Sequence, residues 1–391
     1  MNTKNKTDKK HYNQFSGNCV IVNGIHAKSG GGVTYLRRIL PLLAKNSMLD
    51  IHFFIYEDQF DLFYPFSENI HVTIFRDRAG FVSTQLWEQF SLPFIIKGMG
   101  ADVVFSPANF GPFFVKNHVV LLRNTTSVIK LTKRIRPMFY WFSLSVVTFI
   151  SLVRARKAIA VSHYAARILS FNFHRFFKHK IRVVHHGMNQ PNIEIYRDTG
   201  SCRRILAVSD IYIQKNYHTL IAAFSQLLVK HRDLELVIAG REIDKQYAKD
   251  ILLLVEKLNI GDAVKFLGHL GPKQLSRRYR EADLFVFPST METFGNPLLE
   301  AMVMGLPIVS SNTAAMPEVV GDAGILFNPF SIEDLVKKMQ KVIDNPELRA
   351  ELSIRARERS KLFDIQQTAK QTAEVLVAAA GANNEQQRRL S

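Results

Sequence analysis

Two glutamates separated by seven residues are the first feature of the sequence that could do chemistry. Glu292 and Glu300 lie in the segment FPSTMETFGNPLLEAMVMGLPIV, which follows the apolar run Leu284–Phe287. That run is typical of a buried strand, and Asn296-Pro297 is typical of a helix start, with the asparagine as N-cap and the proline as first helical residue. Glu292 is therefore predicted in the loop at the strand end, and Glu300 about one turn into the helix.

The amino end of this predicted helix could bind a phosphate. Its free N–H groups and its dipole attract anions. A carboxylate at Glu300 could accept hydrogen bonds from two adjacent ribose hydroxyls. Glu292, which lies further out, could hold hydroxyls of a group attached beyond the phosphates. The residue types at this spacing thus indicate a site for a phosphorylated, hydroxyl-rich ligand.

The two glutamates and their context resemble the E-x7-E motif of family 4 glycosyltransferases. The strings ETFGNPLLEAMVMGLPIV, PEVV and GDAGILFNP match the family as well, and the resemblance runs from about Cys19 to Ile365. Members of this family are retaining, nucleotide-sugar-dependent enzymes with the GT-B fold. The resemblance implies that Glu300 holds the donor ribose and that Glu292 orients the sugar. It also implies three further donor-binding residues: Phe294, Gly295 and Asn296.

A lysine is expected at the donor diphosphate. Lys215 lies in VSDIYIQKNYHTLIAAF, which resembles the family segment whose basic residues grip the diphosphate, and a lysine there acts as a compact cation. The family often has an arginine five residues earlier, where this sequence has Asp210. Arg241 or Lys28 is the alternative second cation. The resemblance thus implies that Lys215 acts in catalysis together with Glu292.

The first half of the chain contributes a glycine-rich string, SGGGVTYL, which resembles the glycine loop of the same family. Gly31 and Gly32 would let the backbone approach a phosphate or a sugar, with the next helix pointing at it. The string is not a Walker A loop, because no Gly-Lys-Ser/Thr follows. It is not G-x-G-x-x-G either, because Tyr35 stands at the last glycine. We place both glycines in the donor site.

A histidine that many family members carry near the transferred sugar is missing here. It follows the strand that corresponds to Val119–Leu122, where this sequence continues with Arg123 and Asn124. Asn124 is predicted as a catalytic residue that supplies the hydrogen bond, and Arg123 as the source of a positive field. His26 and His163 are alternatives, and a structural role is equally open for both.

Two series of strands and helices must position these residues. The first runs from the strand Cys19–Ile25 to Ile181–Val184, and the second from Ile205–Val208 to Ile325–Phe327. Continuous apolar strands alternating with helices predict parallel sheets covered on both faces. We therefore predict an α/β protein of the GT-B type, with two doubly wound Rossmann-like domains facing a cleft and ligands at the carboxyl ends of the strands.

Five segments are predicted along the chain. They are a disordered lead (1–17), an N-terminal acceptor-side domain (18–190), a linker (191–201), a C-terminal nucleotide-sugar-binding domain (202–362), and a C-terminal helix and tail (363–391). The helix is expected to cross back over the cleft.

The charge of the chain is large and uneven. Among 391 residues, 51 Lys/Arg and 34 Asp/Glu give a formal net charge of +17. Residues 1–200 hold 26 basic and 11 acidic residues, against 25 and 23 in residues 201–391. No acidic residue lies between Asp102 and Glu194, where 14 Lys/Arg fall. Such an excess indicates a polyanion, either nucleic acid or an anionic membrane. The chain shows no helix-turn-helix or basic–aromatic module, which disfavours nucleic acid.

Neither a metal nor a cofactor is expected. The two cysteines, Cys19 and Cys202, exclude a disulfide scaffold and a Cys-rich zinc module, and no H-E-x-x-H string is present. The family resemblance implies that Lys/Arg side chains and helix dipoles handle the leaving diphosphate. The nucleoside-diphosphate sugar is then a substrate.

One apolar run bears on where the protein works. Met138–Val153 has 16 residues, short of the roughly 20 that span a bilayer, and basic clusters flank it. It is interpreted either as a segment lying in a membrane interface or as a buried helix with a basic rim. The chain starts with MNTKNKTDKK and no apolar signal follows. The expectation is a cytoplasmic protein, peripheral at the inner membrane face.

The predicted function is hexosyl transfer from a nucleoside-diphosphate sugar to a saccharide or lipid-linked saccharide, with retention. The expected setting is bacterial lipopolysaccharide, O-antigen or exopolysaccharide assembly. A nucleotide-sugar epimerase or hydrolase of the GT-B fold, and an inactive sugar-binding relative, are the alternatives. A basic nucleic-acid-binding protein is disfavoured.

Overall fold

The protein contains two parallel β-sheets. The computed structural model describes residues 17–28, 30–76, 80–124, 135–190 and 201–381. The first sheet consists of β1 (Asn18–Asn23), β2 (Leu49–Tyr56), β3 (Ile70–Phe75), β4 (Val103–Ser106), β5 (His118–Leu122), β6 (Lys157–Ala160) and β7 (Ile181–Val183). The second consists of β8 (Arg204–Val208), β9 (Glu235–Ala239), β10 (Val264–Phe266), β11 (Leu284–Phe287), β12 (Ile308–Ser311) and β13 (Ile325–Phe327). The strand orders are β3-β2-β1-β4-β5-β6-β7 and β10-β9-β8-β11-β12-β13, and neighbouring strands are parallel throughout.

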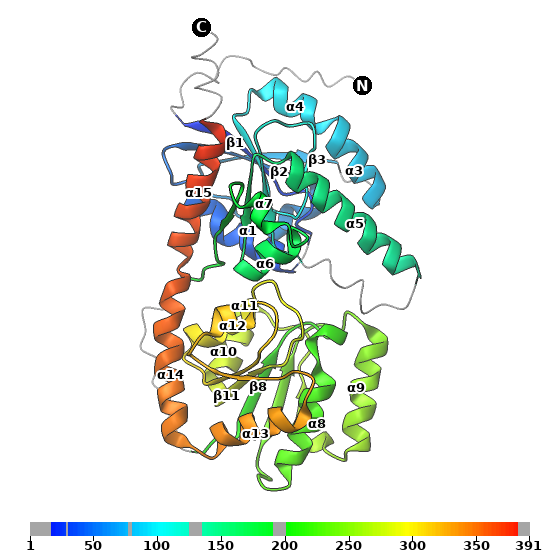
Figure 1. Ribbon diagram of the computed structural model, residues 1–391, viewed down its shortest axis with the longest axis vertical. Helices are drawn as coiled ribbons and strands as arrows, with labels where there is room; N and C mark the ends of the chain where they lie inside the picture. Colours follow the sequence, from blue (N-terminus) through cyan, green and yellow to red (C-terminus); the bar gives the residue numbers. More distant parts are fainter. Residues whose placement is uncertain (1–16, 29, 77–79, 125–134, 191–200, 382–391) are drawn as a thin grey trace.

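Helices cover the faces of both sheets (Figure 1). Those of the first half are α1 (Gly30–Leu43), α2 (Phe60–Phe63), α3 (Phe81–Phe90), α4 (Leu92–Met99), α5 (Ile135–Arg154), α6 (His163–Leu169) and α7 (His174–Phe177). Those of the second half are α8 (Tyr217–Leu228), α9 (Lys245–Lys257), α10 (Pro272–Glu281), α11 (Asn296–Val303), α12 (Met316–Val320), α13 (Ile332–Ile343), α14 (Pro346–Ser360) and α15 (Ile365–Ala380). Two doubly wound α/β units result, as the alternation of strands and helices predicts.

The strand sequences explain this layering. All five residues of β5 and all four of β11 are buried, so these strands are apolar on both faces. Parallel sheets show this pattern because crossover helices cover each side. In α1, Leu36, Ile39 and Leu40 recur at helical spacing and are almost fully buried against the first sheet.

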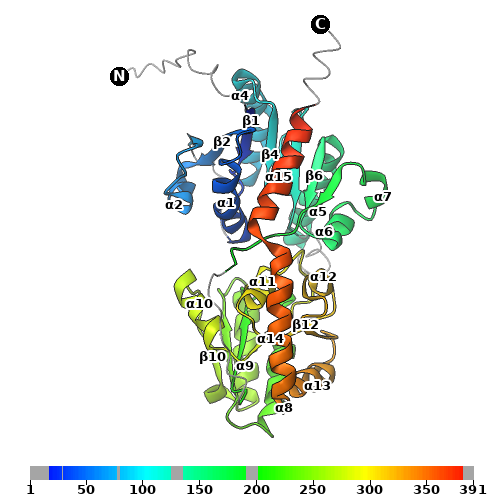
Figure 2. The same cartoon turned by 90° about the vertical axis from the view of Figure 1, so that its left-hand side faces the viewer.

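The last two helices join the two units. α14 packs on α11, and α15 then crosses to the first unit, where it lies along α1 and the strands β1, β4, β5 and β6 (Figure 2). Small residues such as Ala369, Ala373 and Ala380 on its buried face allow a close approach. At its outer side, Arg182 of β7 donates to Glu374 over 2.7 Å. The predicted helix that crosses back is therefore present.

The apolar run Met138–Val153 lies in α5, which is partly buried as one interpretation expects, and its place in a membrane interface stays a prediction. Among the side chains of α5 that are described, Leu144, Thr148 and Leu152 are buried against the first unit. A second stripe remains exposed and apolar: Phe142, Val146, Phe149, Ile150 and Val153. Within the described parts of the chain, no helix has the length and apolar character needed to cross a membrane.

The predicted segment boundaries stay predictions. The first strand begins at Asn18 and the second sheet at Arg204. The predicted lead up to residue 16, most of the predicted linker (191–200) and the tail from residue 382 lie outside the described residues.

Candidate active site

The turn between β11 and α11 has the arrangement predicted for a phosphate site, shifted by one residue. Gly295, not Asn296, is the N-cap, and it has the left-handed dihedrals φ 90° and ψ 63°. Glycine adopts this conformation without strain, whereas asparagine fits the first helical turn beside Pro297. Ser289 Oγ and Asn296 Oδ1 are buried and have no hydrogen-bond partner among the described residues. Buried polar atoms are rarely left unpaired, so these two oxygens indicate a ligand-facing turn.

Glu300 lies on α11 and meets a residue from the other unit. Its Oε2 accepts a hydrogen bond of 3.0 Å from the Tyr279 hydroxyl of α10. Its Oε1 lies 3.6 Å from Arg38 Nη2 of α1. Burial raises the pKa of Glu300, although Arg38 and Tyr279 lower it in part. A carboxylate held at the border of the two units can accept hydrogen bonds from a ligand that enters there.

Lys215 and Glu292 form a close ion pair at the start of the same turn. Lys215 is only 7 % exposed, at the end of the short 3-10 helix Ile213–Lys215. Burial alone would lower the pKa of Lys215, but the Glu292 carboxylate and the Tyr212 hydroxyl outweigh burial and raise it. The ammonium group is therefore charged at neutral pH, and the structure brings these two predicted residues together.

Asp210 stands where the family often has an arginine, and its negative charge is neutralised by a neighbouring arginine. Asp210 accepts two hydrogen bonds from the guanidinium of Arg241, at 3.1 and 2.8 Å. Lys28, the other cation considered from the sequence, pairs with Asp58 on the surface of the first unit. Each of these two alternative cations is thus engaged by a carboxylate.

The glycine-rich string faces this turn from the first unit. Gly31 and Gly32 lie in the first turn of α1, so the predicted loop before the helix is in fact helical. A Cβ atom on Gly31 would lie 3.9 Å from Asn296 Nδ2. A Cβ atom on Gly32 would overlap the guanidinium of Arg123. An alanine at position 32 would therefore force the Arg123 guanidinium to move.

Arg123 is a second basic residue, after Arg38, that the first unit places at this border. Its Nε donates to Pro107 O over 2.9 Å, and its backbone N–H donates to Asn109 Oδ1 over 2.9 Å. Burial lowers the pKa of Arg123 to about 10, against the opposing effect of Tyr35, so the side chain remains charged at neutral pH. Burial lowers the pKa of His186 to about 3, helped by Arg123, so this histidine is neutral.

The Asn124 and His26 side chains do not join this group, whereas His163 lies at the border of the two units, where its backbone N–H donates to Glu318. The Asn124 residue is exposed, and its backbone N–H donates to Asn109 Oδ1 over 3.0 Å. His26 Nε2 lies 3.0 Å from Glu88, and its ring packs on Phe110. The catalytic role of Asn124 stays a prediction.

Direct contacts hold the two units together beside the donor turn. Thr293 donates to the backbone oxygen of Arg123, and Ser162 Oγ donates to Thr293 O over 2.6 Å. Glu318 accepts from the backbone N–H of His163 over 2.8 Å and lies 2.8 Å from His185 Nε2. These bonds fix the register of the two units.

Phe294 supports this border rather than exposing a contact surface. Its side chain is 2 % exposed and packs against His186 and Phe363, with ring centroids 5.3 and 5.6 Å away. Its predicted donor contact would therefore have to come from the backbone.

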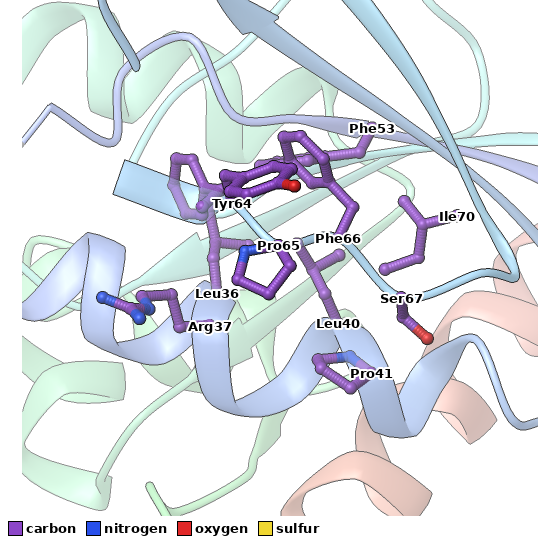
Figure 3. Close-up of a pocket in the computed structure, with 11 residues that line it drawn as sticks. Leu36, Arg37, Leu40, Pro41, Phe53, Tyr64, Pro65, Phe66, Ser67 and Ile70 are labelled. Carbon is purple, nitrogen blue, oxygen red and sulfur yellow. The ribbon is translucent and has the colours of Figure 1, made fainter. Parts of the chain in front are cut away.

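A separate cavity of about 170 Å³ lies between α1 and the segment before β3 (Figure 3). Its lining is mainly apolar and aromatic, with Leu36, Phe53 and Tyr64 among the residues, and Arg37 supplies the charge at its edge. None of the predicted donor residues lines it, so we leave it outside the candidate site.

Sequence reasoning missed three contributors to the site: Arg38, Tyr279 and Glu318. Each acts through a contact between segments far apart in the chain. Arg38 lies six residues after Gly32, on the helix that was predicted to follow the glycines. The side of that helix on which Arg38 lies was the available signal. For Glu318 the signal was the string PEVV, which resembles the family, and for Tyr279 we find no comparable signal.

Part of the chain is similar in sequence to known glycosyltransferases. Residues 195–359 match the family model of the glycosyl transferases group 1. Over 126 residues the chain is 36 % identical to the sulfoquinovosyl transferase SQD2 of Arabidopsis thaliana, covering 31 % of this chain and 24 % of that protein. Over 216 residues it is 32 % identical to a glycogen synthase of Mycobacterium tuberculosis, covering 54 % and 51 %. Over 161 residues it is 31 % identical to the O-antigen chain mannosyltransferase B of Escherichia coli, covering 41 % and 42 %. The matches thus span about half or less of these relatives.

Solved structures resemble the whole described chain. Sucrose-phosphate synthase from Thermosynechococcus elongatus superposes with a TM-score of 0.74 at 18 % identity, covering 93 % of this chain and all of that one. Anabaena Alr3699/HepE in complex with UDP and glucose superposes with a TM-score of 0.71 at 18 % identity, covering 91 % and 98 %. At such identities the likeness shows the fold. The chain therefore has the GT-B fold of these structures, and its residues 195–359 are similar to the glycosyl transferases group 1.

Proposed function

We propose that the protein is a retaining, family 4-like hexosyltransferase that uses a nucleoside-diphosphate sugar. The observation that carries this proposal is the unpaired, buried Asn296 Oδ1 at the amino end of α11. Glu292 lies on the turn before this helix and pairs with Lys215 of the 3-10 helix Ile213–Lys215. Glu300 lies on the helix itself, and Gly31 faces the turn from the other unit. Retention is what the family resemblance implies.

The donor would bind mainly to the second unit. The backbone amides of Gly295 and Asn296 at the start of α11, together with Lys215, would hold the diphosphate. Glu300 would accept the ribose hydroxyls, replacing its 3.6 Å contact with Arg38. Glu292 would orient the sugar, and its pairing with Lys215 links that orientation to the diphosphate. A structural neighbour, HepE, was solved with UDP and glucose, which supports a donor of this class.

Arg123 would supply the second positive charge. As the bond between sugar and diphosphate breaks, negative charge grows on the departing diphosphate, and a fixed cation stabilises it. Asp210 and Arg241 neutralise each other at the position where the family often has an arginine. Arg123 reaches the border from the first unit and remains charged at neutral pH. Metal-independent catalysis by such cations remains part of the proposal.

The acceptor would be a saccharide or a lipid-linked saccharide. The relative O-antigen chain mannosyltransferase B supports a role in bacterial O-antigen, lipopolysaccharide or exopolysaccharide assembly. The first unit also has exposed apolar side chains on α3, α4, the segment 113–114 and α5, which together form an apolar surface. Phe90 of α3 lies beside Phe114, with ring centroids 6.5 Å apart, and Arg154 of α5 donates to Phe113 O over 3.2 Å. We propose that this surface lies on an anionic membrane.

A transfer assay tests the proposed activity. The full chain is incubated with nucleoside-diphosphate sugars, with and without saccharide and lipid-linked acceptors, and diphosphate release is followed. A transferase releases diphosphate faster when acceptor is present and yields a longer saccharide. Equal release without acceptor would favour the hydrolase alternative, and interconversion of the donor sugar would favour the epimerase.

Vesicle flotation tests the membrane surface. Full-length protein should float with vesicles that contain anionic lipid, and Phe94→Asp, at a side chain 77 % exposed, should weaken flotation. Phe330→Asp is the control, because Phe330 is 78 % exposed but lies on the second unit. Equal flotation of both variants, or none for the parent protein at low salt, would contradict the membrane proposal.

A further inference from the structure

Four side chains that commonly bind metals gather at the far end of the first sheet from the donor site. Cys19, Asp50 and His71 are the second residues of β1, β2 and β3, and His52 lies two residues after Asp50. The sheet pairs Cys19 with Asp50 and His52 with His71. Paired residues, and residues two apart on a strand, project from the same face. All four side chains therefore share one face at the amino ends of three adjacent strands.

The side chains of Cys19, Asp50 and His52 lie close enough together to bind one ion, and His71 contacts Asp50 beside them. Asp50 Oδ2 lies 3.1 Å from His52 Nε2, and Asp50 Oδ1 lies 3.3 Å from His71 Nε2. Two ligand atoms about 2.0–2.1 Å from a tetrahedral zinc ion are about 3.3 Å apart. Cys19 Sγ, one carboxylate oxygen of Asp50 and one ring nitrogen of His52 all lie within 4.8 Å of one another.

We propose that Cys19, Asp50, His52 and His71 form a binding site for one zinc ion. A thiolate, two imidazoles and a carboxylate are ligands that zinc takes in tetrahedral sites, whereas magnesium and calcium prefer oxygen ligands alone. The ion would tie β1, β2 and β3 together at their amino ends. It would be structural, because parallel-sheet ligands in catalysis lie at the carboxyl ends.

The surroundings of the cluster suit a cation with access from solvent. The side chains of His52 and Asp50 are 7 % and 16 % exposed, and that of His71 is 51 % exposed. The ion would thus be shielded from solvent on the side of the sheet, and it would reach the site from solvent past the His71 side chain. A second carboxylate, Asp102, accepts a hydrogen bond of 2.8 Å from the backbone N–H of Cys19 and adds negative charge. This proposal departs from the sequence expectation of no metal and does not rest on the proposed glycosyl transfer.

Metal titration of the full chain tests the site. After removal of metal with a chelator, zinc binding is measured by calorimetry and cobalt binding by absorption. One zinc ion per chain is expected, and cobalt should give thiolate-to-metal charge-transfer absorption in the near ultraviolet. Cys19→Ser should lose that absorption. Cys202→Ser, at the buried cysteine of the second unit, should keep it and is the matched control.

A second variant tests whether a loss of binding reflects misfolding. His71→Ala changes a half-exposed side chain and should leave the circular dichroism unchanged. It should weaken zinc binding at least tenfold. Three results would overturn the proposal: no cobalt–thiolate absorption in the parent chain, the same absorption in Cys19→Ser, or zinc affinity unchanged in His71→Ala. In the first case, Asp50 serves only as a hydrogen-bond partner of the two imidazoles.

Discussion

Replacing Lys215 by methionine probes charge and burial at the donor site together. Lys215→Met keeps the length of the side chain and removes the ammonium group that pairs with Glu292. Removing one preorganised group that stabilises transition-state charge typically raises the barrier by about 2.7–4 kcal/mol, or ~10²–10³ in kcat. We expect a loss of this size in kcat.

The same substitution should also reduce the free energy of unfolding. It leaves Glu292, whose side chain is 18 % exposed, without its cation. Breaking a buried ion pair on one side costs about 3–5 kcal/mol, and the remaining exposure of Glu292 places it near or below the lower end of that range. The double variant Lys215→Met/Glu292→Gln removes both charges, so it should regain most of the stability while kcat stays low.

Two measurements separate these effects. Urea unfolding gives the stability of the parent, single and double variants, and acceptor-dependent release of nucleoside diphosphate gives kcat. If Lys215→Met turned over at the parental rate, Lys215 would not stabilise the leaving group. If the double variant regained kcat along with stability, the loss in the single variant would reflect folding alone.

Three further predictions concern the neighbours of Lys215. Glu300→Gln should weaken donor binding by about 10–100-fold, which is the contribution of a charge-assisted hydrogen bond. It should not lower the stability of the fold, because burial already raises the pKa of this carboxyl. Calorimetry with nucleotides measures the binding, and urea unfolding measures the stability. Gly32→Ala should displace Arg123 and reduce kcat at a cost of about 1–3 kcal/mol in stability. In the control Gly31→Ala, kcat and stability should change little, because the atom nearest to the new Cβ would be 3.6 Å away. Equal kcat in the two alanine variants would argue against a role for Arg123. Burial would raise the pKa of Glu318, but its histidine partner and two amides lower it overall. Its stabilisation should therefore be complete above the unfolded pKa of about 4.3 and be lost as the pH falls through the lowered folded value. Unfolding at pH 3–7 should show this acid loss for the parent and a weaker one for Glu318→Gln.

The sequence predicts the architecture well because buried parallel strands leave a strong local pattern. The predicted strand Leu284–Phe287 coincides with β11, and the helix predicted from Lys245 matches α9. The helix start after β11 was wrong by one residue. Asn296 is a good N-cap by type, but Gly295 takes the left-handed conformation that ends the preceding turn.

The contacts between the two units could not be predicted from the sequence. Arg123 was considered only for a positive field, and its position beside Gly32 depends on how α1 meets β5 in space. The contact between Arg38 and Glu300 joins residues 262 positions apart, for which no local pattern exists. The exposed apolar face of α5 likewise depends on which side of the helix the sheet covers.

The most direct test of the account is acceptor-dependent sugar transfer by the full chain, measured for a panel of nucleoside-diphosphate sugars. The account predicts that one donor class gives diphosphate release that rises with acceptor concentration, a product extended by one sugar, and a fall of about 10²–10³ in Lys215→Met. Donor consumption that is independent of every acceptor, or no consumption of any nucleotide sugar, would contradict it.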